Sequence, residues 1–233
     1  TNPSKALILA EIENKYGHKG SYYVQAYLLN TVKNVEILKK IKGLGHEVTY
    51  HHDVMDSNGG DIGKAKIEFR ENLIKFEKHG FKILTVCQHG NPVIVRNGYH
   101  SNRDFFRNKD VKNEFSYVTE IMVDFKNKIK QEYKYISDSG YGWKVIFDPE
   151  NNDLLDSSEK DKKLKDLKEV VEFIKANDRI IISTHPHRWS RNNGEALFVS
   201  FSFKVIKFIV KLFLKIPGVR KIMGKFYFLA KKI

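Results

Sequence analysis

Histidine and aspartate residues occur where several predicted strands of this 233-residue chain end. Four strands are followed by such residues: His51, His52 and Asp53 after the first, His89 after the second, Asp138 after the third and His185 after the fourth. Because ligands gather at the carboxyl ends of strands in parallel α/β folds, we expect these side chains to converge. Imidazole nitrogens and carboxylate oxygens can hold a divalent metal, and a nearby histidine can act as general acid or base. The pattern therefore favours a metal-dependent hydrolytic site.

Each of these residues also has a plainer interpretation. His51 and His52 could be solvent-facing turn residues, and His89 could simply end a strand. His185 is the most strongly indicated, because it closes the apolar run 180–184 (IIIST) at a fixed rim. Four other histidines are predicted to be structural or solvated: His18, His46, His79 and His100.

The elements that position these residues alternate along the chain. Apolar residues at helical spacing predict helices over 4–16, 35–44, 62–79 and 161–177. Runs rich in β-branched and aromatic residues predict strands over 21–27, 47–51, 81–87, 134–138 and 179–184. A long polar loop is expected over 91–112 and a glycine-rich loop over 139–143. This alternation predicts an α/β fold with several parallel strands.

The composition excludes several classes of protein. Hydrophobic residues make up 41% and aromatic residues 12% of the chain, which is enough for a sizeable core and excludes disordered, collagen-like and disulfide-stapled chains. The single cysteine, Cys87, can form neither an internal disulfide nor a thiolate-only zinc site. The sequence starts at Thr1 with no signal-peptide pattern, and we expect it to belong to a longer chain.

The net charge of +13 is concentrated at the C-terminal end. Residues 200–233 contain nine basic residues and no Asp or Glu, which leaves 32 basic and 28 acidic residues and a net charge of +4 in the first 199. A nearly balanced body offers no basic groove, so we expect no nucleic-acid partner. Two regions are predicted: a body over 1–195, which contains the candidate site residues, and a basic helical tail over 196–233.

The tail has an amphipathic pattern. Residues 196–216 are apolar around most of a helical circumference, with one stripe of lysines spaced by three or four. Four lysines disfavour a membrane-spanning helix, since each costs about 2.5–3.5 kcal/mol near the bilayer centre. The pattern favours contact of 200–233 with an anionic membrane surface, with packing over the body or binding in a partner's groove as alternatives. The expected location is cytoplasmic, peripheral at the inner face of the membrane.

Residues 45–51 (GHEVTYH) resemble the Gly-His-Glu-Ile-Gly-x-His segment of the NodB-like polysaccharide deacetylases, carbohydrate esterase family four. Further stretches carry this resemblance in the family's order: 10–17, 21–23, 51–56, 88–92, 135–140 and 183–189. The chain is most similar to a divergent branch found near surface-polysaccharide biosynthesis, over about residues 1–190. The resemblance implies an α/β fold of the distorted (β/α) barrel type and metal-dependent removal of acetyl groups from amino sugars.

The resemblance also implies roles for individual residues. His51 matches the first metal-binding histidine, and His89 is expected to contribute to the site of a divalent metal, with zinc favoured. His185 matches the histidine that acts as general acid toward the leaving amine, and Asp138 lies where the family's fourth motif orients that histidine. Contacts with the carbohydrate substrate are assigned to Trp143, Trp189, His52 and Asn91. For Trp189, ordinary packing is the alternative.

Two departures from the family pattern bear on activity. The family's second metal histidine lies four residues after the first, where this chain has Met55, so that Asp56, His52 or His89 would have to replace it. The family's first motif, an Asp-rich strand end, would lie immediately before Thr1. We therefore expect a metal-dependent hydrolase acting on C–N amide bonds. The alternative is a non-catalytic deacetylase-like protein that binds a glycan or a partner at a membrane surface.

Overall fold

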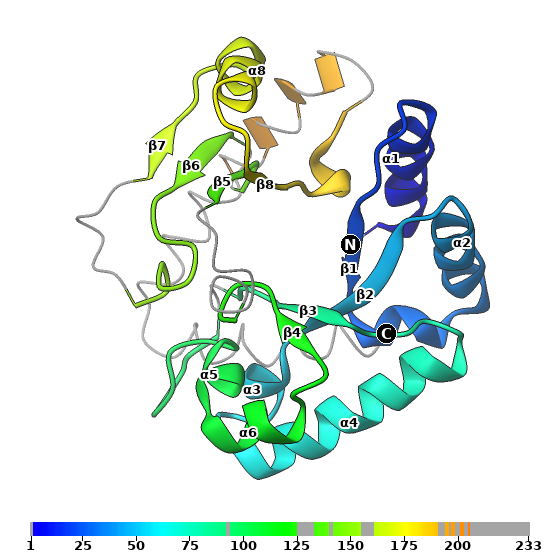
Figure 1. The fold of residues 1–233 in the computed structure, drawn as a ribbon, viewed down its shortest axis with the longest axis vertical. Helices are drawn as coiled ribbons and strands as arrows, with labels where there is room; N and C mark the ends of the chain where they lie inside the picture. Colours follow the sequence, from blue (N-terminus) through cyan, green and yellow to red (C-terminus); the bar gives the residue numbers. More distant parts are fainter. Residues whose placement is uncertain are drawn as a thin grey trace.

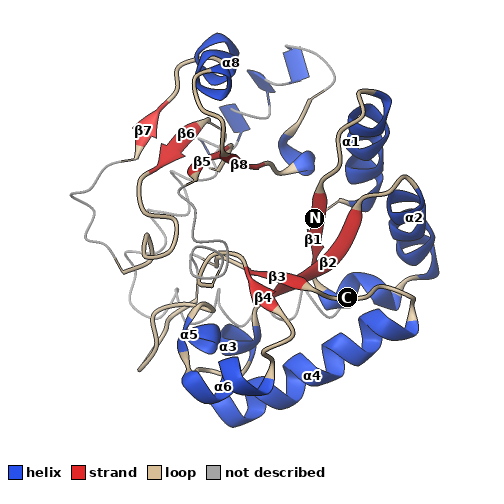
Figure 2. Ribbon diagram, viewed as in Figure 1, coloured by secondary structure: helices blue, strands red, loops and turns tan. Residues whose placement is uncertain are grey.

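The computed structural model describes residues 2–91, 94–124, 133–139, 142–154 and 161–190, together with 194–195, 197–198, 201–202 and 205. The fold is mixed α/β and contains two four-stranded sheets (Figures 1 and 2). The strands lie toward the centre of the molecule, and helices α1, α2, α4 and α8 lie around the outside (Figure 1). We refer to residues 2–124 as the first half and to residues 133–190 as the second half.

The first sheet is entirely parallel. Its order is β1 (Ser21–Val24), β2 (Glu47–His52), β3 (Thr85–Gln88) and β4 (Thr119–Glu120). His51 is paired in register with Cys87, and His52 with Gln88. His51 and His89 therefore stand close to the same carboxyl edge of the sheet.

The second sheet is mixed. Its order is β7 (Lys162–Lys163), β6 (Lys144–Ile146), β5 (Lys134–Ser137) and β8 (Ile180–Ser183). β5 runs parallel to β8, and β6 runs antiparallel to both β5 and β7. The α/β prediction is confirmed, but the strands of the described ranges form two separate sheets and no closed barrel is seen among them.

Helices pack their apolar faces on the first sheet. The helix α1 (Pro3–Lys15) begins at Asn2, whose side chain accepts a hydrogen bond from the Lys5 amide, and α2 spans Val32–Gly43. The long α4 (Ile62–Lys78) is capped by Asp61 and buries Phe69 and Phe76. The 3-10 helix η1 (Ala26–Asn30) and the short helices α3 (Val54–Ser57), α5 (Asp104–Arg107) and α6 (Lys109–Glu114) complete the first half.

The two halves have very different cores. The first half contains a large cluster of buried apolar residues with many aromatic rings, among them Phe69, Phe105 and Phe115. The core cluster of the second half consists of Ile136, Leu164 and Val170, covered by α8 (Leu167–Lys175) and flanking side chains. Among the described residues, the second half therefore buries much less apolar surface than the first half.

Several predicted boundaries differ from the structure. The strand predicted over 81–87 begins at Thr85, because residues 81–84 only lead into the sheet. The loop predicted over 91–112 contains α5 and most of α6, and the helix predicted over 161–177 is shortened by β7 at its start. The polar or very short segments α3, β4 and β6 carry no periodic apolar pattern and were not predicted. The tail prediction over 196–233 falls almost wholly outside the described residues.

An arginine–carboxylate contact joins the two halves. Arg103 and Arg107 bind Asp153, which lies between β6 and β7, with nitrogen–oxygen distances of 2.8 Å for Arg103 and 2.9 and 3.0 Å for Arg107. Both guanidinium groups also donate to the carbonyl oxygen of Glu150. Burial alone would raise the pKa of Asp153, but hydrogen bonds from Arg107 and Ser101 and the charge of Arg103 lower it to about 2. The contact is therefore an ionic pair at every pH near neutrality.

We expect Asp153→Asn to destabilise the protein by about 2–3 kcal/mol, because Arg103 is only 3% exposed and would lose its counter-charge. Urea unfolding followed by circular dichroism measures this loss. Asp161→Asn is the matched control, since the Lys144–Asp161 pair lies within the second half and is more exposed. This control is expected to cost less than about 1 kcal/mol. Equal losses would show that Asp153 does not hold the halves together.

Candidate functional site

His185 and Asp138 form a hydrogen-bonded pair at the ends of two neighbouring parallel strands. Ser137 of β5 is in register with Ser183 of β8, so the residues that follow each strand leave the sheet side by side. The Asp138 Oδ1 atom lies 2.5 Å from His185 Nδ1, and Oδ2 accepts the His185 backbone N–H at 2.9 Å. The carboxylate thus fixes both the backbone and the ring of the histidine.

Two further side chains hold Asp138 in place. The indole N–H of Trp189 donates to Asp138 Oδ2 at 3.2 Å, and Arg188 Nη1 donates to the Asp138 carbonyl oxygen at 2.9 Å. Burial would raise the pKa of Asp138, but the hydrogen bonds and charge of His185 outweigh it and the pKa is lowered. Asp138 is therefore ionised at neutral pH.

The ionised carboxylate determines what the His185 ring can do. A carboxylate only accepts hydrogen bonds, so Nδ1 carries the proton that faces Asp138 and Nε2 is the atom that can gain or lose a proton. The His185 side chain is 35% exposed, which leaves it accessible from solvent. An imidazole oriented in this way by a carboxylate is suited to general acid–base catalysis.

His51 and His89 form a second pair at the edge of the first sheet. Their ring centroids are 4.9 Å apart, and His51 Nδ1 lies 2.9 Å from the carbonyl oxygen of Cys87. The carbonyl can only accept, so Nδ1 of His51 carries the proton and its Nε2 has a lone pair. Burial lowers the pKa of His51 to about 3, and the charges of His89 and His185 act in the same direction. His51 is therefore neutral at physiological pH.

The donor set fits part of a metal site. A neutral imidazole whose other nitrogen is bound to a backbone carbonyl is the usual arrangement of a metal-ligating histidine, and His51 has it. His89 is placed beside it. Within the described ranges, however, no group of three or more His, Cys, Asp or Glu side chains could hold a metal ion. These ranges supply two imidazole ligands and not a complete coordination sphere.

His52 is not part of this group. Its side chain is 0% exposed and is surrounded by the rings of Tyr50, Phe69, Phe105 and Phe106. Neither ring nitrogen has a hydrogen-bond partner within the described part of the chain. Since residues alternate between the faces of a strand, His52 points into the core on the side opposite to His51. This placement gives it no surface to offer to a sugar.

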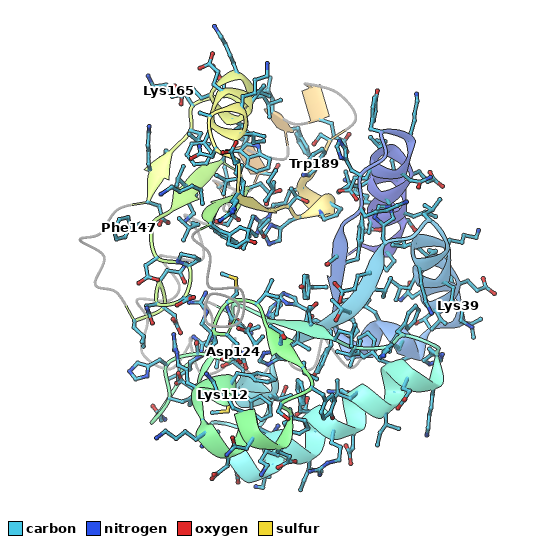
Figure 3. The ribbon with its side chains drawn as sticks, in the orientation of Figure 1. Lys39, Lys112, Asp124, Phe147, Lys165 and Trp189 are labelled. Atoms are coloured by element: carbon cyan, nitrogen blue, oxygen red, sulfur yellow. The ribbon has the colours of Figure 1, made fainter. Side chains whose placement is uncertain are left out.

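The two tryptophans differ in environment. Trp143 packs against the small core of the second half, and its carbonyl oxygen accepts the Leu164 amide at 2.9 Å. Trp189 is 47% exposed and lies after β8 beside α1 (Figure 3), where its carbonyl oxygen accepts Lys5 Nζ at 3.0 Å. The Trp189 ring therefore combines a contact with Asp138 and an exposed surface, whereas Trp143 is a packing residue.

Asp56 anchors the loop that follows His89. Its carboxylate accepts hydrogen bonds at 2.8–3.0 Å from Arg96, which binds with two nitrogens, and from Tyr99 and Asn102. Asn102 also accepts the Asp56 backbone N–H and donates to the carbonyl oxygen of His89 at 2.8 Å. Because its oxygens are occupied in this way, Asp56 does not serve as a replacement for the family's second metal histidine.

Asn91, to which a contact with the substrate was assigned, is only 4% exposed, and its carbonyl oxygen accepts Arg96 Nη2 at 3.0 Å, so it too belongs to the anchored loop. One buried acid of this region was not predicted from the sequence. Glu120, at the end of β4, is fully buried and accepts the backbone N–H groups of Gln88 and Met122. Burial raises the pKa of Glu120 to about 7. The strand that carries it spans two residues, too short for a sequence pattern.

Comparison of the chain with protein-family models, curated proteins and solved structures finds no match. The resemblance to polysaccharide deacetylases therefore stays a prediction. The class of protein that the structure defines is a mixed α/β fold with a parallel four-stranded sheet and a second, mixed sheet.

We expect Asn102→Ala to destabilise the protein by about 2–3 kcal/mol, because it leaves the buried Asp56 amide and carboxylate short of partners. Asn102→Asp, which has the same shape, should cost at least as much, since it places a carboxylate against Asp56. Urea unfolding measures both. Asn177→Ala, which removes a single bond to the Phe173 carbonyl oxygen, is the control and should cost about 1 kcal/mol. A fully stable Asn102→Asp variant would contradict the proposed anchoring.

A pH dependence follows from His52, whose pKa burial lowers to about 3. The unfolded chain binds a proton at this histidine below its ordinary pKa of about 6.5, whereas the folded protein does not, so stability falls as the pH is lowered from 6.5 toward 3. Between pH 6 and pH 5 the native protein should lose about 1 kcal/mol more than His52→Leu. Phe69→Leu, in the same aromatic cluster, has no titrating group and should keep the native pH slope. A native slope in His52→Leu would refute the assignment.

Proposed function

We propose that this protein is a metal-dependent hydrolase that removes acetyl groups from amino sugars of a surface polysaccharide or its precursor. The observation that carries the proposal is the His185–Asp138 pair, with the neutral His51 and its neighbour His89 close by. The resemblance stated above supports it, because these four residues occupy the positions of the family's metal and catalytic motifs. The proposed fold is a distorted (β/α) barrel of that family, with the two sheets as its parts.

His185 supplies the proton that amide cleavage needs. When the water oxygen bonds to the acetyl carbon, the water loses a proton, and when the carbon–nitrogen bond breaks, the departing sugar nitrogen requires one to leave as an amine. In this proposal His185 Nε2 takes the proton from the water and gives it to the nitrogen, while Asp138 holds the ring in position. Trp189 keeps Asp138 in position and offers its exposed face to the sugar.

His51 and His89 would hold a divalent metal, zinc by preference, through imidazole nitrogens. Such a metal would activate the attacking water and stabilise the oxyanion on the acetyl group. In the family that the chain resembles, an Asp-rich motif supplies further ligands.

One observation favours the alternative, a non-catalytic relative that binds a glycan or a partner protein. The described ranges contain no cluster of three metal-ligating side chains, and Met55 stands where the family has its second histidine. In that case the His185–Asp138 pair and Trp189 would form a polar and aromatic surface for a sugar.

We expect Asp138→Asn to lower acetate release from N-acetylglucosamine oligosaccharides by about 10²–10⁴-fold, because His185 loses its orienting carboxylate. The bound metal should be unchanged in this variant, since Asp138 is paired with His185 and not with His51. His51→Ala should instead lose metal. Acetate assays and elemental analysis of zinc measure the two effects.

His100→Ala is the matched control, because the His100 side chain is 69% exposed and pairs with Asp104. It should keep native metal content and native activity. Native protein that takes up no zinc and releases no acetate would overturn the hydrolase in favour of the binding protein. Metal content unchanged in His51→Ala would overturn the ligand assignment alone.

A further inference from the structure

A row of exposed apolar side chains begins the C-terminal tail. Leu197, Phe198, Phe201 and Val205 are helical, and 73%, 71%, 68% and 39% of their respective surfaces are exposed. At 100° per residue these four positions fall within an arc of about 100°, so they share one face of a helix. We call these four residues the apolar tail face. Residues 196, 199–200, 203–204 and 206–233 of the tail lie outside the described residues.

An exposed face of this kind calls for a partner. Each phenylalanine offers about 150–250 Å² of apolar surface, and burial of such surface is worth about 25 cal/mol per Å². Contiguous exposed apolar side chains on a protein surface mark interaction sites, whereas scattered ones do not. The apolar tail face therefore indicates a binding surface.

The charge around this face restricts the partner. The sequence from 200 to 233 contains nine basic residues and no acidic residue, and four of its lysines, at 204, 207, 211 and 215, are spaced by three or four residues. A partner must therefore combine an apolar interior with negative charge at its rim. A second copy of the chain is disfavoured, because it would bring two equally basic tails together.

We propose that the apolar tail face binds the surface of an anionic lipid bilayer. The phenylalanine and leucine side chains enter the boundary between headgroups and acyl chains, while the lysine stems cover apolar surface and their ammonium groups reach the lipid phosphates. In the described part of the chain no helix is long and apolar enough to cross a bilayer, which is consistent with contact at one surface. This proposal does not depend on the catalytic one.

Sedimentation with lipid vesicles tests the proposal on the full 233-residue chain. We expect binding to vesicles of phosphatidylcholine with about one-third phosphatidylglycerol, at least tenfold weaker binding to phosphatidylcholine alone, and loss of binding at high salt. Replacing Lys204, Lys207, Lys211 and Lys215 by Gln should weaken binding on the order of a hundredfold. Phe198→Ser/Phe201→Ser should weaken it by at least on the order of a hundredfold, with the charge unchanged.

The matched control is Phe147→Ser/Ile67→Ser. Both residues are exposed apolar side chains outside the tail, and Phe147 projects from the segment after β6 (Figure 3). This variant should bind vesicles like the native protein, and circular dichroism should show the native fold for all variants. No binding to either vesicle would overturn the proposal.

Native binding by Phe198→Ser/Phe201→Ser would also overturn it, because the apolar tail face would then not be the contact. If the protein binds both kinds of vesicle equally and salt has no effect, the proposed requirement for anionic lipid is wrong. If the native protein ignores vesicles but forms oligomers that Phe198→Ser/Phe201→Ser abolishes, the partner is a second copy of the chain and not a bilayer.

Discussion

The ionic contact of Asp153 with Arg103 and Arg107 is the constraint on which the candidate site depends. His51 and His89 stand on the first sheet, whereas Asp138 and His185 stand on the second, and no ladder joins the two sheets in the described ranges. The part of the second half's apolar core that the structure describes is small. The ionic contact is a direct link between the halves, because the buried Arg103 would be left without a counter-charge if Asp153 moved away.

Burial acts on the two pairs of the site with opposite results. For His51 burial disfavours the protonated ring, and the nearby histidines reinforce this, so the ring is neutral and its lone pair is available. For Asp138 burial disfavours the carboxylate, but the donors of His185 and Trp189 more than compensate, so the charge is kept. At neutral pH the site therefore contains a neutral histidine, His51, and a second histidine, His185, that is hydrogen-bonded to the ionised Asp138. This difference agrees with the roles proposed for them, His51 as a metal ligand and His185 as an acid–base group.

The sequence is sufficient for the parts of the fold that repeat a simple pattern. Helix α4 and strand β2 follow from apolar periodicity, and residues at the ends of strands were expected to converge, as Asp138 and His185 do. The orientation of His52 was not accessible in this way, because adjacent histidines on a strand look alike until the register decides which faces the core. Neither was the mixed character of the second sheet, which depends on the antiparallel β6, a three-residue strand with no distinctive composition.

The same limit explains Asp56, which in sequence resembles a metal ligand as much as an anchor. A carboxylate is suited to both roles, and only the position of Arg96, forty residues away, decides between them. With Asp56 bound by Arg96, Tyr99 and Asn102, and His52 enclosed by aromatic rings, His89 is the one candidate of the three that lies beside His51. The loop that Asp56 anchors returns to the His89 carbonyl oxygen through Asn102. Asp56 thereby helps to fix the backbone of His89, the histidine that we propose as a ligand.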